Sequence, residues 1–408
     1  MEVKEMDFRD YCGLNRPRFQ VDPVADAEWF FGNRRVNDEL LTRVINDMDA
    51  RGTPKCCLFG RFGCGKTHTL YYLKHMFDKH PESYPAIGVF VNVAPYDEST
   101  PNLGGWKYIQ GKMLDEIGED LLRQIIRDFE KLPEGRTDEL ATLMKQEFKF
   151  GDENLKRSLA NVFVGYFLRE MKSTAKAWQW LKGAKVDKAD IEDLGVTKQL
   201  ENASDMVNVL MNIGSLVRKT YGKSLVFLMD ESQALNEVDK RETEIHHAFL
   251  QMASDFNQDL GFIIAYFGDT IQSIPPVIST PPDILSRMGV TIENLDEAII
   301  NLMKVISTKK DMESFINDIL KGTKNQNKAE DIIKEFGLGA KVSWEQLPFE
   351  QEALNRTIDM LWQSEATRNP RMIINQLANL QVTAYHKAKE ADTYFTVDID
   401  FVNSTMRL

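Results

Sequence analysis

The segment Gly60–Thr67 limits what this chain can fold into more than any other feature. It reads Gly-Arg-Phe-Gly-Cys-Gly-Lys-Thr and matches the phosphate-loop pattern G-x-x-x-x-G-K-[ST] at every fixed position. The apolar run Cys56–Phe59 before it is short enough for a buried strand, and His68–Phe77 after it carries apolar residues at helical spacing. Strand, glycine loop and helix is the order in which this pattern binds phosphate. The alternative is a glycine turn without function.

The loop has the chemistry that a nucleotide phosphate needs. Its glycines let backbone N–H groups turn inward around the phosphates, and the start of the following helix adds a partial positive charge. We expect Lys66 to reach the β- and γ-phosphates and the Thr67 hydroxyl to bind Mg²⁺. The residues expected to bind ATP are Gly60, Arg61, Phe62, Gly63, Cys64, Gly65, Lys66, Thr67 and His68.

Composition indicates a reduced, cytoplasmic protein that does not cross a membrane. The chain has 408 residues, enough for two or three domains, and 43% of them are apolar. The net charge of −12 argues against a surface devoted to nucleic acid, although a local basic strip or a pore formed on assembly stays open. No apolar stretch approaches the roughly 18 residues that span a bilayer. The four cysteines have neither zinc nor disulfide spacing; Cys64 in the loop leaves regulation by oxidation as an alternative.

The apolar runs predict an α/β fold with a doubly wound parallel sheet. Continuous runs of this kind indicate strands buried on both faces, and they alternate with helical patterns. The predicted strands after the loop are Ile87–Val93, Ser224–Met229, Gly261–Phe267 and Val290–Ile292. Single helices are expected at Val36–Met48, Tyr108–Phe129, Leu155–Met171 and Met206–Tyr221.

Three domains follow from these patterns. Residues 1–29 form a polar arm laid over the nucleotide-binding domain, which covers residues 30–294. A helical insertion occupies about 104–220 of that domain, and residues 295–408 form a helical lid. Within the lid we expect a polar loop at 321–328, a long helix at Met372–Ala388 and a strand at Tyr394–Val397.

Two carboxylates complete the predicted site. Asp230 and Glu231 directly follow a strand, at the edge where ligands bind in open α/β sheets. Asp230 is our candidate for holding Mg²⁺ opposite Thr67, and Glu231 is our candidate general base, which polarises the attacking water. The alternative is a strand that ends at solvent. Asn92 ends the preceding strand, and it either bonds and gates Glu231 or caps a turn.

These pieces resemble the AAA+ ATPases, in particular the origin-recognition and signal-transducing (STAND) branches. Phe30–Asn33 is similar to the family's Phe-x-Gly-Arg box, with Asn33 in place of Arg. The phosphate loop, the Asn-terminated strand and the Asp-Glu strand then follow in family order. The resemblance implies a polar sensor within Gly268–Thr270, for which Asp269 and Thr270 are the candidates.

The same resemblance implies two catalytic arginines. Ser286-Arg287 is similar to the box that supplies an arginine finger to a neighbouring subunit; the alternative is a surface arginine near a sheet edge. Thr367–Arg371 is similar to the Gly-x-x-Arg entry to a lid helix, with Arg368 in place of Gly. Arg371 would then contact the γ-phosphate, and the alternative is an ordinary surface ion pair.

The helical insertion carries a shorter likeness. Trp180–Gly183 and Leu194–Val196 resemble ATPases of bacterial phage-resistance (BREX-type) operons. Trp178 and Trp180 are either an exposed partner-binding surface or fillers of a helical core. We therefore expect an ATPase that uses Mg²⁺ and ATP to drive assembly or partner remodelling, with antiviral defence as one role. It would work as a homo-oligomer or with an operon partner. The alternatives are a DNA-directed loader or regulator and a nucleotide-gated scaffold with little turnover.

Overall fold

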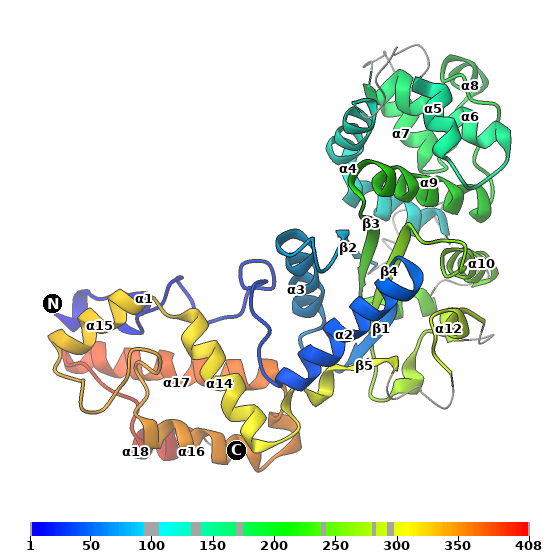
Figure 1. The fold of residues 1–408 in the computed structure, drawn as a ribbon. Helices are drawn as coiled ribbons and strands as arrows, with labels where there is room; N and C mark the ends of the chain where they lie inside the picture. The colour runs from blue at the N-terminus through cyan, green and yellow to red at the C-terminus, as the bar shows by residue number, and fades with distance from the viewer. Residues whose placement is uncertain are drawn as a thin grey trace. The chain divides into compact units, whose positions relative to one another are not determined.

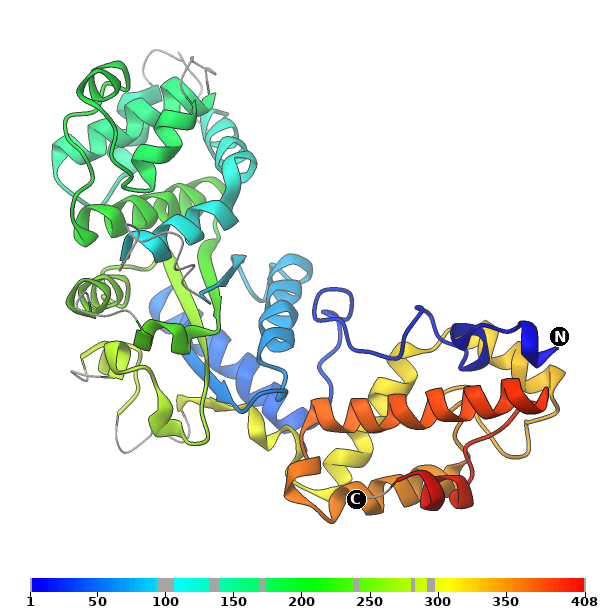
Figure 2. The same ribbon diagram turned by 180° about the vertical axis from the view of Figure 1, so that it is seen from behind.

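The computed structural model describes residues 2–93, 106–131, 140–168, 174–237, 242–279, 283–291 and 298–406 (Figures 1 and 2). Its contacts divide the chain into two compact units. The lid unit combines Met1–Asp38, Gly60–Tyr72 and Asn301–Leu408, and the sheet unit combines Glu39–Phe59 and Leu73–Ile300. The phosphate loop and the first turns of its helix therefore group with the lid. None of the helices in the described ranges has the length and apolar content needed to cross a bilayer.

A five-stranded parallel sheet forms the core of the sheet unit, in the order β2-β3-β4-β1-β5. The strands are β1 (Lys55–Gly60), β2 (Ala86–Asn92), β3 (Ser224–Asp230), β4 (Leu260–Phe267) and β5 (Ile300–Asn301). Every residue of β1 and β3 is buried, as expected for apolar strands covered on both faces. The predicted α/β class with a parallel sheet is confirmed.

Register shows that helices cover opposite faces of this sheet. Gly88 of β2 pairs with Val226, and a Cβ on Gly88 would lie 3.0 Å from the Phe77 ring of α3 (Lys66–Lys79). The next row of residues across the strands faces the opposite side of the sheet. This row contains Phe262 of β4, whose ring centroid lies 5.6 Å from that of Phe249 on α10 (Glu242–Met252). Since adjacent residues of a strand face opposite sides, α3 and α10 lie on opposite faces.

One predicted strand was wrong. Val290 and Thr291 are not in a strand, and Ile292 lies outside the described residues, as does the predicted domain boundary at 294/295. The backbone N–H of Val290 donates instead to Leu285 O (2.8 Å), which closes the turn after α12 (Asp283–Arg287). Gly289 allows this turn with a φ of +72°. The edge strand beside β1 is supplied by Ile300–Asn301.

The predicted helical insertion is present over its described parts. It contains α4 (Trp106–Glu130), α5 (Leu140–Glu147), α6 (Glu153–Val162), η3 (Phe163–Leu168), α7 (Thr174–Leu181), α8 (Lys188–Asp193) and α9 (Ala203–Tyr221). The single helix predicted at Tyr108–Phe129 is instead broken at Gly118, whose φ of +71° no regular helix contains. The helix predicted to reach Met171 ends at Val162 and continues as η3, and Met171 lies outside the described residues.

The two insertion tryptophans differ in burial. Trp180 is fully buried, and its indole N–H donates to Lys198 O at 3.0 Å. Trp178 is half-buried, its indole N–H donates to Asp115, and the Lys182 ammonium lies 5.7 Å from its ring centroid. Of the two alternatives for these tryptophans, core filling holds for Trp180, which is not part of an exposed partner-binding surface.

The lid unit is helical, as predicted. Its helices are α14 (Lys309–Thr323), α15 (Gln326–Glu335), α16 (Gln351–Trp362), α17 (Pro370–Ala391) and α18 (Ile399–Thr405). The polar loop expected at 321–328 is only a two-residue break, because Asn325 caps α15 by accepting a bond from Lys328 N (3.1 Å). The strand expected at Tyr394–Val397 is limited to an isolated bridge between Val397 and Phe349.

The beginning of the chain packs on the lid helices. The Tyr11 ring stacks on Tyr394 with centroids 4.6 Å apart, and the Tyr394 hydroxyl donates to Tyr11 O (2.6 Å). The backbone N–H of Asn15 donates to Thr323 O, and that of Asn325 donates to Gly13 O. These residues belong to the arm expected over the nucleotide-binding domain. Tyr11 is buried against the lid instead, whereas at the end of the arm Trp29 O bonds His68 of α3 at 2.7 Å.

Trp180→Ala should destabilise the sheet unit by about 3–5 kcal/mol, because it opens a large cavity and leaves Lys198 O without its donor. Trp178→Ala is the matched control, and we expect a loss of about 1 kcal/mol. Urea unfolding followed by circular dichroism measures both. Equal losses in the two variants would contradict the different burial of the two rings.

Candidate nucleotide-binding site

The phosphate loop runs from the end of β1 to the start of α3, and its course depends on two glycines. Gly63 has a φ of +80° and Gly65 a φ of +90°, in the left-handed region that favours glycine. A Cβ on Gly65 would have no atom within 4 Å, so the backbone there borders open space. The helix that follows begins at Lys66, and the N–H groups of its first turn point out of the helix toward the loop.

Lys66 is a buried cation held by the loop itself. The residue is 6% exposed, and its ammonium donates to Gly60 O at 3.0 Å and Arg61 O at 3.2 Å. The same nitrogen lies 5.7 Å from the Phe62 ring centroid. Backbone carbonyls are neutral acceptors, whereas a phosphate oxygen is charged and forms a stronger bond with an ammonium. The arrangement therefore suits an anion in the loop.

Within the loop, Cys64 is buried and Phe62 is exposed to solvent. Burial raises the pKa of the Cys64 thiol, and its backbone N–H donates to Arg61 O at 3.3 Å. A thiol kept protonated in this way reacts slowly with oxidants, which disfavours the oxidation alternative. The Phe62 ring is 60% exposed.

The start of the lid helix α17 is seated directly on the loop. Asn369 caps this helix, and its amide also donates to Phe62 O at 2.6 Å. The backbone N–H of Arg371 donates to Gly63 O at 3.3 Å. The approach is so close that a Cβ on Gly63 would lie 2.5 Å from Asn369 Oδ1 and 2.6 Å from Arg371 Cβ. The structure thus brings Arg371 to the loop, and Asn369 is a contact that our motif search missed.

The Phe30–Asn33 box contacts α3 at His68. The Phe31 ring stacks on His68 with centroids 5.2 Å apart, and His68 Nε2 bonds Trp29 O at 2.7 Å. Burial is the main cause that lowers the pKa of His68. Asn33 N donates to Val305 O at 3.2 Å, in the segment that leads into the lid. His68, predicted to bind nucleotide, is therefore engaged by the box in this structure.

The carboxylate pair lies at the end of β3 in the sheet unit. Asp230 is 3% exposed, and its Oδ1 accepts the backbone N–H of Glu231 at 2.9 Å. Asn92 lies opposite Asp230 in the β2–β3 register, at the same edge of the sheet. Glu231 has a φ of +54°, which is rare for a residue with a side chain. Its carboxylate accepts a bond from the Gln233 amide, a partner that our motif search missed.

The remaining predicted residues lie elsewhere in the sheet unit. Asp269 and Thr270 follow β4 and are exposed, and Thr270 O accepts the N–H of Ser273 at 3.0 Å. Arg287 is the last residue of α12 and is exposed, and its guanidinium donates to Leu250 O at 2.9 Å. A finger role requires Arg287 to exchange that carbonyl for a phosphate in a neighbouring subunit.

The residues present fit Mg²⁺ with ATP. Mg²⁺ prefers oxygen ligands, usually takes one or two from the protein, and completes its shell with water and phosphate. Thr67 and Asp230 offer a hydroxyl and a carboxylate. Within the described residues no group of three or more His, Cys, Asp or Glu side chains could hold a metal by itself.

Fold and loop together define the class: the chain is an α/β P-loop protein with a helical insertion and a helical lid. No protein-family model and no curated protein matches it. Among solved structures, it is similar to the Orc1 protein of Aeropyrum pernix in complex with DNA. That match has 8% sequence identity and a TM-score of 0.43, and covers 93% of this chain but 65% of the Orc1 chain.

Gly63→Ala should lower the melting temperature more than Gly65→Ala. Both place a side chain at positive φ, at a cost of about 1–2 kcal/mol. Only the methyl group added at position 63 meets the start of α17, which adds about 1–3 kcal/mol of overpacking. Thermal unfolding without nucleotide measures the difference. Equal losses would show that α17 is not seated on Gly63.

Proposed function

We propose that this protein binds ATP with Mg²⁺ and hydrolyses it. The observation that carries the proposal is the phosphate loop between β1 and α3, with a buried lysine cation beneath its backbone. The Asp230–Glu231 pair supports it, because β1 and β3 belong to one parallel sheet and the carboxyl ends of such strands meet at one edge. Binding and hydrolysis require both halves.

In this proposal each residue has one task. The Lys66 ammonium leaves the Gly60 and Arg61 carbonyls and binds the β- and γ-phosphates. Thr67 and Asp230 hold Mg²⁺, which supplies neutralisation of the phosphate charge. Glu231 accepts a proton from the attacking water, and Arg371 adds positive charge near the γ-phosphate. Such a reaction depends mainly on position and charge, and the residues supply both.

We further propose that hydrolysis changes the assembly state or partner contacts, as the resemblance to AAA+ ATPases implies. The lid supports this, because α17 contacts the loop at Phe62 and Gly63. A phosphate bound in the loop would therefore alter the contacts of α17. Turnover stimulated by DNA would favour the loader interpretation. Tight ATP binding with negligible turnover would favour the scaffold. A role in antiviral defence rests on the sequence likeness alone.

Lys66→Ala and Glu231→Gln should separate binding from chemistry. Loss of the Lys66 ammonium should weaken ATP binding about tenfold or more and abolish turnover, because charge-assisted hydrogen bonds to the phosphates are lost. Glu231→Gln should bind ATP as the wild type does and lose about 10²-fold or more in turnover. Calorimetric titration measures binding, and phosphate release measures turnover. Wild-type turnover by Glu231→Gln would remove the general-base assignment.

Arg287 should act on a neighbouring subunit. Arg287→Ala and Lys66→Ala should each be inactive alone, since a finger contributes about 10³–10⁵ in rate. Mixing them should restore part of the activity, because some interfaces then pair an intact loop with an intact finger. Hydrolysis per subunit should also rise with protein concentration. Full activity of Arg287→Ala as a monomer would exclude the finger.

A further inference from the structure

Gln233 links the two strand ends that border the candidate catalytic carboxylate. It lies two residues after Glu231, in the short η4 (Ser232–Glu237), and its amide nitrogen donates to Glu231 Oε2. Its amide oxygen accepts the backbone N–H of Phe267, the last residue of β4, at 3.0 Å. One side chain therefore connects the end of β3 to the end of β4.

The backbone of β4 fixes which way the Gln233 amide points. Oxygen and nitrogen of an amide are assigned from their partners, and a backbone N–H can only donate. Phe267 N–H therefore requires the Gln233 oxygen, so the NH₂ group must face Glu231. A carboxylate accepts such a bond well, and the charge makes it stronger than a bond between neutral groups. The contact is thus determined by chemistry as well as by proximity.

Glu231 is held at its backbone as well. Its N–H donates to Asp230 Oδ1 at 2.9 Å, and its carbonyl accepts Ala234 N at 3.0 Å. These bonds accompany the positive φ of Glu231, a conformation that persists only where the surroundings hold it. Gln233 in turn donates to one of the two Glu231 carboxylate oxygens, Oε2.

We propose that Gln233 is a positioning residue for the general base: it orients the Glu231 carboxylate and ties it to the end of β4. The inference rests on the proposed ATPase function. It also links Glu231 to the expected polar sensor, because Gly268–Thr270 directly follows Phe267, whose N–H Gln233 accepts at the end of β4. A shift of that segment on nucleotide binding would reach Glu231 through the Gln233 amide.

Two substitutions separate positioning from packing. Gln233→Glu keeps the shape and the acceptor for Phe267 N–H but replaces the donor to Glu231 with a second carboxylate. Gln233→Leu has similar size and removes both bonds. Gln179→Glu, a position on α7 away from the strand ends, controls for the added charge in the sheet unit. The measurements are ATP affinity, kcat and melting temperature.

We expect ATP affinity within about threefold of wild type for both Gln233 variants, and a kcat lower by about tenfold or more, since small displacements of reacting groups are costly. Gln233→Glu should lose kcat although it keeps the acceptor for Phe267 N–H, because its carboxylate repels that of Glu231 instead of donating to it. Gln179→Glu should match wild type.

The outcomes distinguish this inference from the proposed function. If Glu231→Gln is inactive while both Gln233 variants keep wild-type kcat, the positioning role is overturned. If Gln233→Glu keeps wild-type kcat and only Gln233→Leu loses kcat, together with melting temperature, Gln233 is only a packing residue. If the wild type does not hydrolyse ATP, or Glu231→Gln matches it, the proposed function itself fails.

Discussion

The direction of four carbonyl groups in the phosphate loop determines how the rest of the candidate site is organised. Gly60 O and Arg61 O accept bonds from the Lys66 ammonium, while Phe62 O and Gly63 O accept bonds from Asn369 and Arg371 of the lid. In a planar trans peptide the C=O and N–H groups point in opposite directions. With its carbonyls turned to the lysine and the lid, the loop can present N–H groups other than that of Cys64 to an anion, because the Cys64 N–H donates to Arg61 O. The left-handed glycines make that course possible.

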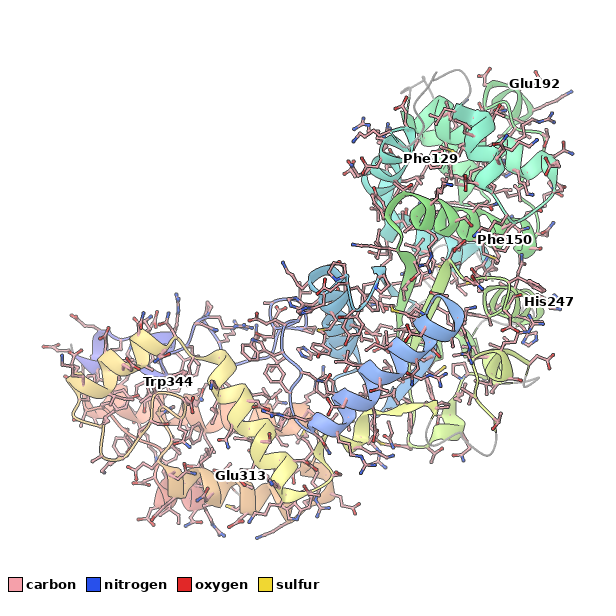
Figure 3. The ribbon with its side chains drawn as sticks, in the orientation of Figure 1. Phe129, Phe150, Glu192, His247, Glu313 and Trp344 are labelled. Carbon is pink, nitrogen blue, oxygen red and sulfur yellow. The ribbon has the colours of Figure 1, made fainter. Side chains whose placement is uncertain are left out.

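The phosphate loop therefore belongs to the lid unit by its contacts. Gly60–Tyr72 groups with the lid helices, and the start of α17 reaches the loop through a capping Asn and a backbone N–H. Figure 3 shows the side chains of both units as sticks on the ribbon. We expect a phosphate that changes the loop to change these two contacts of α17 as well. In the sheet unit, Gln233 has a comparable role, because it joins the carboxylate to β4.

The features that could be predicted from sequence are those set by residues close together in the chain. The phosphate loop, the α/β class and the position of Asp230 at a strand end are encoded locally, by glycine spacing and continuous apolar runs. Gln233 and Asn369 are not, since their roles depend on partners far away in the sequence. A signal existed for Asn369: Asn followed by Pro is typical of a helix start, although it does not say what the cap contacts. For Trp180 the sequence left exposure and core filling open, because a short helical pattern does not show which face is covered.

The most direct test of the central claim is a crystal structure with Mg²⁺, ADP and beryllium fluoride, which imitates the bound γ-phosphate. We predict the phosphates within Gly60–Thr67, with the Lys66 ammonium moved from the Gly60 and Arg61 carbonyls onto them. The Glu231 carboxylate should face the fluoride through a water molecule. A nucleotide bound away from the loop, or a Lys66 that stays on the two carbonyls with the nucleotide in place, would contradict the account.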